Sequence, residues 1–324
     1  MSLRAEDTWW IPVAAVRDLP SDAPLAAARL AEPVVLWHDG SVPRAFTDRC
    51  PHRGAQLSLG RVADGALECA YHGWRFEGAG RCVAVPALPA FTPPASHHAC
   101  ALRVRDAHGL LWVAGSDAPE SEPQAPPALL ELPRRRLLCG PYDVATSAPR
   151  VVENFLDTAH FGIVHEGWLG DRSHLEVPDY EVRPDAQGRP GVPEYRAWQP
   201  QGSAAAAGGS WVRYRYQLLS PYAALLEKQA EGDAPREAYA LWVCPLEPDR
   251  CRVWFTIFTS HAQRSDAELI AFQDRIFLQD RPILESQRPR TLPLAGDEVH
   301  SAADRLSMAY RRWLRSERIT YGVC

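Results

Sequence analysis

The chain has 324 residues, of which 46% are hydrophobic and 23% are charged. This composition supplies enough apolar side chains for a packed core and excludes an extended disordered chain. The formal net charge of −5 argues against a nucleic acid or an anionic membrane surface as the partner. At about 150 residues per domain, the length predicts two domains.

Segments that would direct the chain to a membrane or out of the cell are not visible. No apolar run approaches the roughly 18 residues of a membrane span, and the first ten residues lack the apolar core of a secretory signal. We therefore expect a cytoplasmic protein. Its eight cysteines are too few for a disulfide scaffold, so Cys and His residues at close spacing predict metal ligands.

The first third of the chain consists of short β-type runs separated by Gly and Pro turns. Val34–Trp37 and Leu110–Val113 are examples within residues 8–115. Many short strands at close spacing predict a small antiparallel sandwich or barrel. We assign residues 1–116 to this domain and residues 117–136, which are rich in Pro and Glu, to a connecting segment.

Two Cys/His pairs lie within this β domain. Cys50-Pro-His52 is followed, after sixteen residues, by Cys69-Ala-Tyr-His72. Each pair combines a thiolate with an imidazole, which suits a two-iron cluster in which both cysteines bind one iron and both histidines bind the other. A mononuclear zinc site is the alternative, although its usual order places two cysteines before two histidines.

A second group of polar side chains lies in a segment with helical apolar spacing, Pro149 to Val164, which predicts a helix. On an ideal helix, His165 lies ~140° from His160, so the helix must end or bulge near Gly162 if both bind one ion. Two histidines and one carboxylate can hold Fe(II) and leave positions open. A helix with ordinary core histidines is the alternative. The metal-capable residues are Glu153, Asn154, Asp157, His160 and His165.

The rest of the chain mixes strands and helices. Alternating runs predict strands over 211–219, 239–243 and 252–258, and capping boxes predict the starts of two helices, Ser265–Leu278 and His300–Arg315. This mixture of strands and helices predicts an α+β domain over residues 137–324.

Both metal motifs resemble those of one family, the Rieske non-haem iron oxygenases. Cys50-Pro-His52-Arg-Gly and Cys69-Ala-Tyr-His72-Gly-Trp resemble its Rieske 2Fe-2S motif, and the spacing Asn-x2-Asp-x2-His-x4-His is similar to its mononuclear iron motif. The resemblance implies an N-terminal all-β Rieske domain followed by a helix-grip catalytic domain with an antiparallel sheet. It also implies one 2Fe-2S cluster, bound by the two Cys/His pairs, and one mononuclear Fe(II), bound by His160 and His165, with O2 as co-substrate.

The third iron ligand follows from the same resemblance. The stretch Phe277–Gln287 resembles the Asp-containing stretch of the family and implies Asp280 as the ligand. Asp280 could instead cap a turn that begins near Pro282. Asp274 and Glu285 are competing candidates for the same role.

Two further residues acquire roles from the resemblance. Asp157 would hydrogen-bond His160 of its own chain and His72 of the adjacent chain, forming a short electron path between subunits. Asn154 would be a polar neighbour of the iron. Glu153 we expect to support the site rather than to bind the metal.

The implied function is that of a terminal oxygenase from the homotrimeric branch that includes vanillate and dicamba O-demethylases and N-demethylases. Such an enzyme hydroxylates or oxidatively demethylates a small aromatic or heterocyclic compound. The chain lacks a glycine-rich dinucleotide motif, so the electrons would come from a separate FMN/2Fe-2S reductase or ferredoxin. The alternatives are a ring cis-dihydroxylating α subunit, a Rieske electron carrier, and a desaturase or cyclase.

Overall fold

The computed structural model describes residues 4–115, 123, 135–201, 208–231, 236–262, 264–296 and 298–324. The chain divides into two compact units, Met1–Pro123 and Gln124–Cys324. Within the expected connecting segment 117–136, the last two arginines already belong to strand β11 (Arg135–Val144). Apart from these and Pro123, that segment lies outside the described residues.

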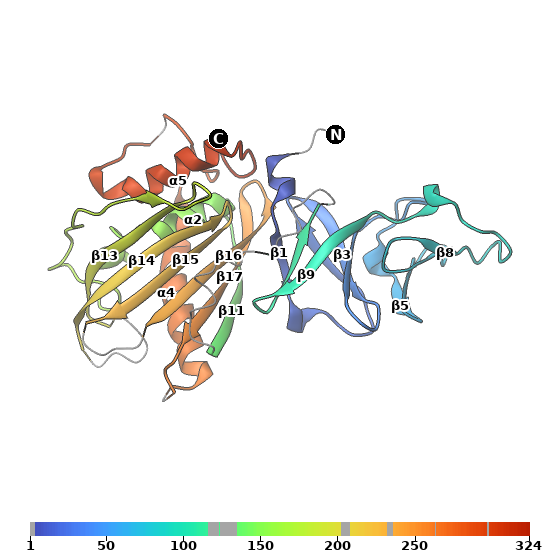
Figure 1. Ribbon diagram of the computed structural model, residues 1–324, viewed down its shortest axis with the longest axis horizontal. Coiled ribbons are helices and arrows are strands. Elements are labelled where there is room, and N and C mark those ends of the chain that lie inside the picture. The colour runs from blue at the N-terminus through green and yellow to red at the C-terminus, as the bar shows by residue number, and fades with distance from the viewer. Residues whose placement is uncertain are drawn as a thin grey trace. The chain divides into compact units, whose positions relative to one another are not determined.

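The first unit contains two antiparallel sheets (Figure 1), and the predicted all-β architecture is confirmed. Their strand orders are β1-β10-β9-β4-β3-β2 and β5-β6-β7-β8. One buried cluster joins Trp37 and Phe46 of the larger sheet to Cys50 and Cys69. The elements are η1 (Ala5–Thr8), β1 (Ile11–Ala15), η2 (Val16–Asp18), β2 (Leu25–Arg29), β3 (Glu32–His38), β4 (Pro43–Thr47), η3 (Leu57–Leu59), β5 (Arg61–Ala63), β6 (Ala66–Glu68), β7 (Arg75–Phe76), β8 (Cys82–Ala84), η4 (Ala95–His97), β9 (Ala101–Ala107) and β10 (Leu110–Ala114).

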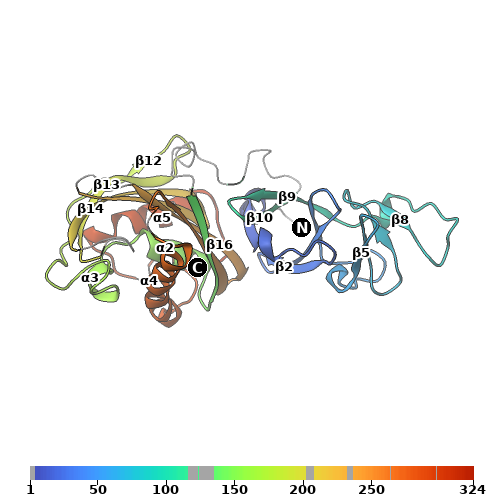
Figure 2. The same ribbon diagram turned by 90° about the horizontal axis from the view of Figure 1, so that it is seen from below.

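The second unit is a seven-stranded antiparallel sheet, in the order β11-β17-β16-β15-β14-β13-β12, with helices on one face (Figure 2). Helix α2 packs on β15, β16 and β17 and contacts both α4 and α5. The predicted α+β class is confirmed. The remaining elements are α2 (Ala148–Leu156), α3 (Phe161–Val164), β12 (Arg183–Pro184), β13 (Pro190–Gln199), β14 (Ser210–Ser220), β15 (Ala223–Ala230), β16 (Glu237–Glu247), β17 (Arg250–Thr259), α4 (Asp266–Ser286), η5 (Ala302–Asp304) and α5 (Arg305–Ser316).

The prediction of one helix from Pro149 to Val164 is wrong, because the chain forms two helices there. Helix α2 ends at Leu156, and Asp157 adopts an extended backbone with φ −81° and ψ 139°. The Asp157 Oδ1 atom accepts a hydrogen bond from the Ala159 N–H at 3.0 Å. Such a side-chain bond competes with helix continuation, so the break comes before His160 and not near Gly162.

Helix α4 is longer than the predicted Ser265–Leu278. The capping box of Ser265 and Glu268 is present, but the helix runs through Asp280 and Pro282 to Ser286. Proline removes one backbone N–H, and the carbonyl that loses its partner is that of Leu278. Because Leu278 and Pro282 are both on the exposed side of the helix, water can satisfy that carbonyl. Asp280 is therefore a residue within the helix, and its interpretation as a cap is wrong.

The other predicted elements of this unit are present with shifted ends. The predicted strands lie within β14, β16 and β17, and the Ser301–Asp304 capping box opens η5, which leads into α5. Over the described part of the chain, no helix has both the length and the apolar character that a membrane-spanning helix requires.

Candidate metal centres

The two Cys/His pairs lie on two loops with the same backbone hydrogen-bond pattern. Each loop begins at a cysteine and turns at a glycine with positive φ, +72° at Gly54 and +70° at Gly73. A left-handed backbone favours glycine there. The repeated turn brings four ligand-type side chains to one end of the unit. The bonds run from Cys50 N to Ala55 O (2.8 Å), Gly54 N to Cys50 O (2.9 Å), Cys69 N to Trp74 O (2.9 Å) and Gly73 N to Cys69 O (3.0 Å).

The side chains of these loops meet in two pairs, cysteine with cysteine and histidine with histidine. Cys50 and Cys69 are each 2% exposed, and the rings of His52 and His72 have centroids 4.5 Å apart. Burial raises the pKa of the Cys50 thiol to about 11, and the neighbouring Cys69 adds to the rise. Two thiolates would therefore coexist here only beside a cation.

A buried nitrogen supports the same conclusion. The His52 Nδ1 atom is buried and has no hydrogen-bond partner among the described residues. A buried imidazole nitrogen without a hydrogen-bond partner lowers the stability of a folded protein unless it binds a metal. The donor set of two thiols and two imidazoles thus fits a Rieske cluster.

Aromatic stacking covers one of the two histidines. The Trp74 ring lies parallel to the His52 ring, with 4.5 Å between centroids, and it also lies parallel to the His97 ring, with 5.1 Å between centroids. His72, in contrast, is exposed beside Tyr71. The contact of His97 was not expected, because no local sequence pattern connects residues 23 positions apart.

In the second unit, three side chains form a compact triangle of ligand atoms. The His160 Nε2 and His165 Nε2 atoms are 3.2 Å apart, and Asp280 Oδ1 lies 3.5 Å from the first and 3.2 Å from the second. A single ion can be about 2.1 Å from all three atoms of such a triangle. The arrangement fits a metal bound on one face by two histidines and one carboxylate.

Hydrogen bonds to the outer nitrogens orient both imidazoles. The Asp157 Oδ2 atom accepts from His160 Nδ1 at 2.9 Å, and the Gln279 Oε1 atom accepts from His165 Nδ1 at 2.9 Å. With Nδ1 protonated, each Nε2 presents a lone pair to the triangle. Sequence reasoning missed Gln279, although it directly precedes the candidate ligand Asp280.

The remaining candidates are distributed around this triangle. The Asn154 Nδ2 atom lies 3.4 Å from Asp280 Oδ1, at the edge of the site. The two competing carboxylates have other partners: Asp274 accepts from the Tyr142 hydroxyl, and Glu285 accepts from the backbone N–H of residue 145 and from the Arg281 side chain.

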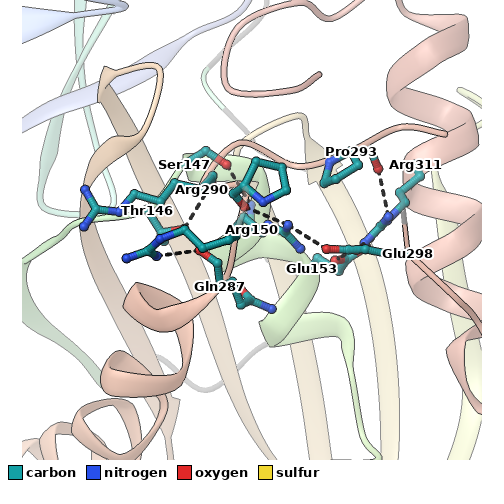
Figure 3. Close-up of polar contacts among 11 residues, drawn as sticks. Thr146, Ser147, Arg150, Glu153, Gln287, Arg290, Pro293, Glu298 and Arg311 are labelled. Atoms are coloured by element: carbon teal, nitrogen blue, oxygen red, sulfur yellow. Dashed lines mark hydrogen bonds and ion pairs between the residues drawn. The ribbon is translucent and has the colours of Figure 1, made fainter. Parts of the chain in front are cut away.

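Glu153 belongs to a largely buried ionic cluster (Figure 3), and among the described residues it makes no hydrogen bond or ion pair with the triangle. Arg311 of α5 contacts both carboxylate oxygens of Glu153, at 2.5 and 2.7 Å, and Glu298 at 2.5 Å. Arg150 of α2, which is 2% exposed, reaches Glu298 at 2.7 Å. Two arginines and two glutamates thus neutralise one another and fasten α2, whose end carries the metal-site residues, to α5 and to residue 298.

The triangle opens into a cavity between the sheet and helices α2, α3 and α4. The cavity has a volume of about 80 Å³, which is room for several water molecules. Its walls are largely aromatic and aliphatic, which suits an apolar planar compound. Besides the triangle, the lining residues include Asn154, Phe155, Tyr214, Leu226, Lys228, Tyr239, Phe255, Phe272, Gln273 and Phe277.

Comparisons with known proteins cover both units. Residues 9–102 match the Rieske [2Fe-2S] domain, and residues 144–318 match the vanillate O-demethylase oxygenase C-terminal domain. The chain is 32% identical to the methylxanthine N1-demethylase NdmA of Pseudomonas putida over 314 residues, 95% of this chain and 88% of that protein. It is 39% identical to the probable methylxanthine N7-demethylase NdmC of Pseudomonas sp. (strain TJI-51) over 225 residues, 68% and 79% of the two chains.

A solved structure shares the fold. The structure of Pseudomonas putida CBB5 NdmA with caffeine superposes with a TM-score of 0.81 at 30% sequence identity, covering 96% of this chain and 90% of that chain. Both units therefore occur together in one known architecture.

Proposed function

This chain belongs to the Rieske non-haem iron oxygenases, a family of oxidoreductases, and on that premise we propose that it oxidatively removes a methyl group from a small aromatic or heterocyclic compound. The observation that carries the proposal is the His-His-Asp triangle at the wall of a small, largely aromatic cavity. Relatives named as methylxanthine N-demethylases, aligned over most of this chain, support the same reaction class.

Each metal centre has its own ligand set in this proposal. Cys50 and Cys69 bind one iron of a 2Fe-2S cluster, and His52 and His72 bind the other. His160, His165 and Asp280 bind one Fe(II) per chain. When bound, the cluster supplies stored electrons and the single iron supplies the chemistry of O2, the co-substrate.

The protein itself positions the metal ligands and the substrate and shields them from water. Asp157 and Gln279 hold the two imidazoles in the tautomer that leaves Nε2 free for the metal. Asn154 donates to Asp280 and keeps that carboxylate turned to the same face. The aromatic walls hold a planar compound with its methyl group toward the triangle and keep water out of the reaction space.

We further propose that the chain works as a homotrimer in which Asp157 bridges two subunits. Its carboxylate is 27% exposed although it binds His160, and His72 is exposed at the edge of its loop. An accessible carboxylate and an accessible imidazole can meet across a subunit boundary. Asp157 would then connect the cluster of one chain to the iron of the next.

A separate electron-donor protein, a reductase or a ferredoxin, completes the system, and we place the enzyme in the cytoplasm.

Turnover with a reductase tests the proposed reaction. Purified enzyme, an FMN/2Fe-2S reductase and NADH are incubated with caffeine, theobromine or 4-methoxybenzoate, and formaldehyde and the demethylated product are quantified. We expect one formaldehyde per demethylated product for at least one of these compounds. A cis-diol without formaldehyde would instead identify a ring dihydroxylase.

A further inference from the structure

The chain contains 35 basic Lys and Arg residues, and one of them is a lysine, Lys228. This lysine lies in the wall of the metal-site cavity. It is on β15 and only 7% exposed. Lysine is seldom buried unless its charge has a partner, so this position calls for a chemical reason.

The side chain of Lys228 points toward the helices. Side chains two apart on a strand share a face, and Leu226 and Lys228 both line the cavity. The Lys228 Nζ atom lies 4.6 Å from the centroid of the Tyr239 ring and 5.9 Å from that of the Phe272 ring. Because Tyr239 is on β16 and Phe272 is on α4, the ammonium group lies between the sheet and the helix, in the layer that holds the cavity.

Two acidic residues bear on the charge of Lys228, one beside it on the next strand and one in the same cavity wall. Glu237 is the cross-strand neighbour of Lys228, and its Oε1 atom also lies 3.5 Å from His261 Nε2. Burial lowers the pKa of Lys228, and the charge of Glu237 opposes that change. The other formally charged residue among the described cavity-lining residues is Asp280, which faces the two imidazoles. Lys228 is the one lysine or arginine among the described residues that line this cavity.

We infer that Lys228 recognises an anionic oxygen of the substrate, such as a carboxylate or an acidic ring oxygen of a heterocycle. This inference deepens the proposed function and rests on it for the placement of the methyl group near the triangle. Recognition of the anion does not itself require turnover. A divalent ion held by Asp280 and the two neutral imidazoles would leave the cavity with net positive charge, which also favours an anion.

Binding of a matched pair of probes tests the inference. The dissociation constants of 4-methoxybenzoate and its neutral counterpart 4-methoxybenzamide are measured by calorimetry on the anaerobic, reduced holoenzyme. We expect the wild-type protein to bind the anion at least about tenfold more tightly than the amide. Lys228→Met should remove that preference, whereas Leu226→Met, on the same face of the same strand, should retain it.

A second substitution covers the case in which Lys228→Met does not fold. Lys228→Gln keeps a polar side chain of similar length without the charge and should likewise remove the preference for the anion. The inference is overturned if the wild-type protein shows no preference, or if the preference survives Lys228→Met or Lys228→Gln. Absence of formaldehyde from every compound would contradict the proposed demethylation and would leave this binding result unaffected.

Discussion

At the residue scale, Asp157 has both a local and a longer-range role. It ends α2, accepts the Ala159 N–H and holds His160 Nδ1. Burial opposes ionisation of this carboxyl, but the hydrogen bonds from His160 and from the backbone hold the pKa of Asp157 below its usual value. A carboxylate that stays charged and is fixed from one side can accept a second imidazole from the other side.

Asp157→Asn tests this role. We expect both metal sites to remain loaded, because asparagine keeps an oxygen acceptor for His160 Nδ1, while turnover falls about 100-fold. Iron content, the cluster spectrum and the turnover rate are measured together. Asp171→Asn is the matched control, because Asp171 makes the same i,i+3 bond to His174 at 2.9 Å away from the triangle. Unchanged turnover in Asp157→Asn would remove the bridging role.

Gln279 orients the other imidazole, and its substitution should affect the metal itself. Gln279→Leu deletes the acceptor for His165 Nδ1, so we expect the single iron to be lost about 10- to 100-fold more readily to a chelator. Gln279→Glu keeps an oxygen acceptor and should retain the metal. The readout is the iron remaining after timed chelation. Equal retention by the Leu and Glu variants would show that the hydrogen bond is unimportant.

At the scale of the elements, the position of α2 determines the site. The helix supplies Asn154 and ends directly before Asp157, and Arg150 and Glu153 fasten it to the ionic cluster (Figure 3). Charges in such a cluster are costly to bury and must all be matched. Loss of one member should therefore loosen α2 against α5.

Arg311→Met tests the cluster. Removal of this guanidinium leaves Glu153 as a buried carboxylate without its bidentate partner, so we expect the free energy of unfolding to fall by about 3 kcal/mol. The neighbouring Arg312 is exposed, and Arg312→Met should change the free energy of unfolding by less than about 0.5 kcal/mol. Denaturant titration of both variants gives the comparison. Equal stabilities would show that the cluster contributes nothing.

Local signals explain which elements could be predicted. The capping boxes at Ser265 and Ser301 and the two Cys/His loops lie within a few residues of sequence, and each is present. The end of α2 could not be predicted, because apolar spacing continues past Leu156 and the break depends on one side-chain bond from Asp157. The continuation of α4 past Leu278 could not be predicted either, because it depends on the exposed position of Pro282 on the helix.

The parts of the candidate site that depend on contacts between residues distant in sequence were harder to predict. Asp280 was proposed from a resemblance, and the structure brings it to His160 and His165. The bond between His165 and Gln279 spans 114 positions, and no spacing predicts it. No sequence motif marks Lys228. Its place in the cavity depends on the register of β15 with β14 and β16.

At the scale of the whole molecule, the proposed trimer makes each electron path cross a subunit boundary. Cys69→Ser should leave a chain without its cluster, and His160→Ala should leave a chain without its single iron. Each variant alone should be inactive. If electrons pass between neighbouring chains, trimers formed from an equal mixture should recover about a quarter of the wild-type rate, because about one boundary in four joins an intact cluster to an intact iron site.

The control for this mixture uses a single chain that carries both substitutions. When this doubly substituted chain is added in excess to wild-type protein, the rate should not exceed that of the same amount of wild-type protein alone. No recovery in the mixture of single variants, with trimers verified by sedimentation, would place electron transfer within one chain.

Counting iron and acid-labile sulfide per chain tests the central claim most directly. Protein purified anaerobically with iron and sulfide should contain three irons and two labile sulfides per chain and absorb as a reddish-brown Rieske protein. His160→Ala should contain two irons with the absorption unchanged. One zinc without labile sulfide, or a cluster spectrum that disappears in His160→Ala, would contradict two separate iron centres in this chain.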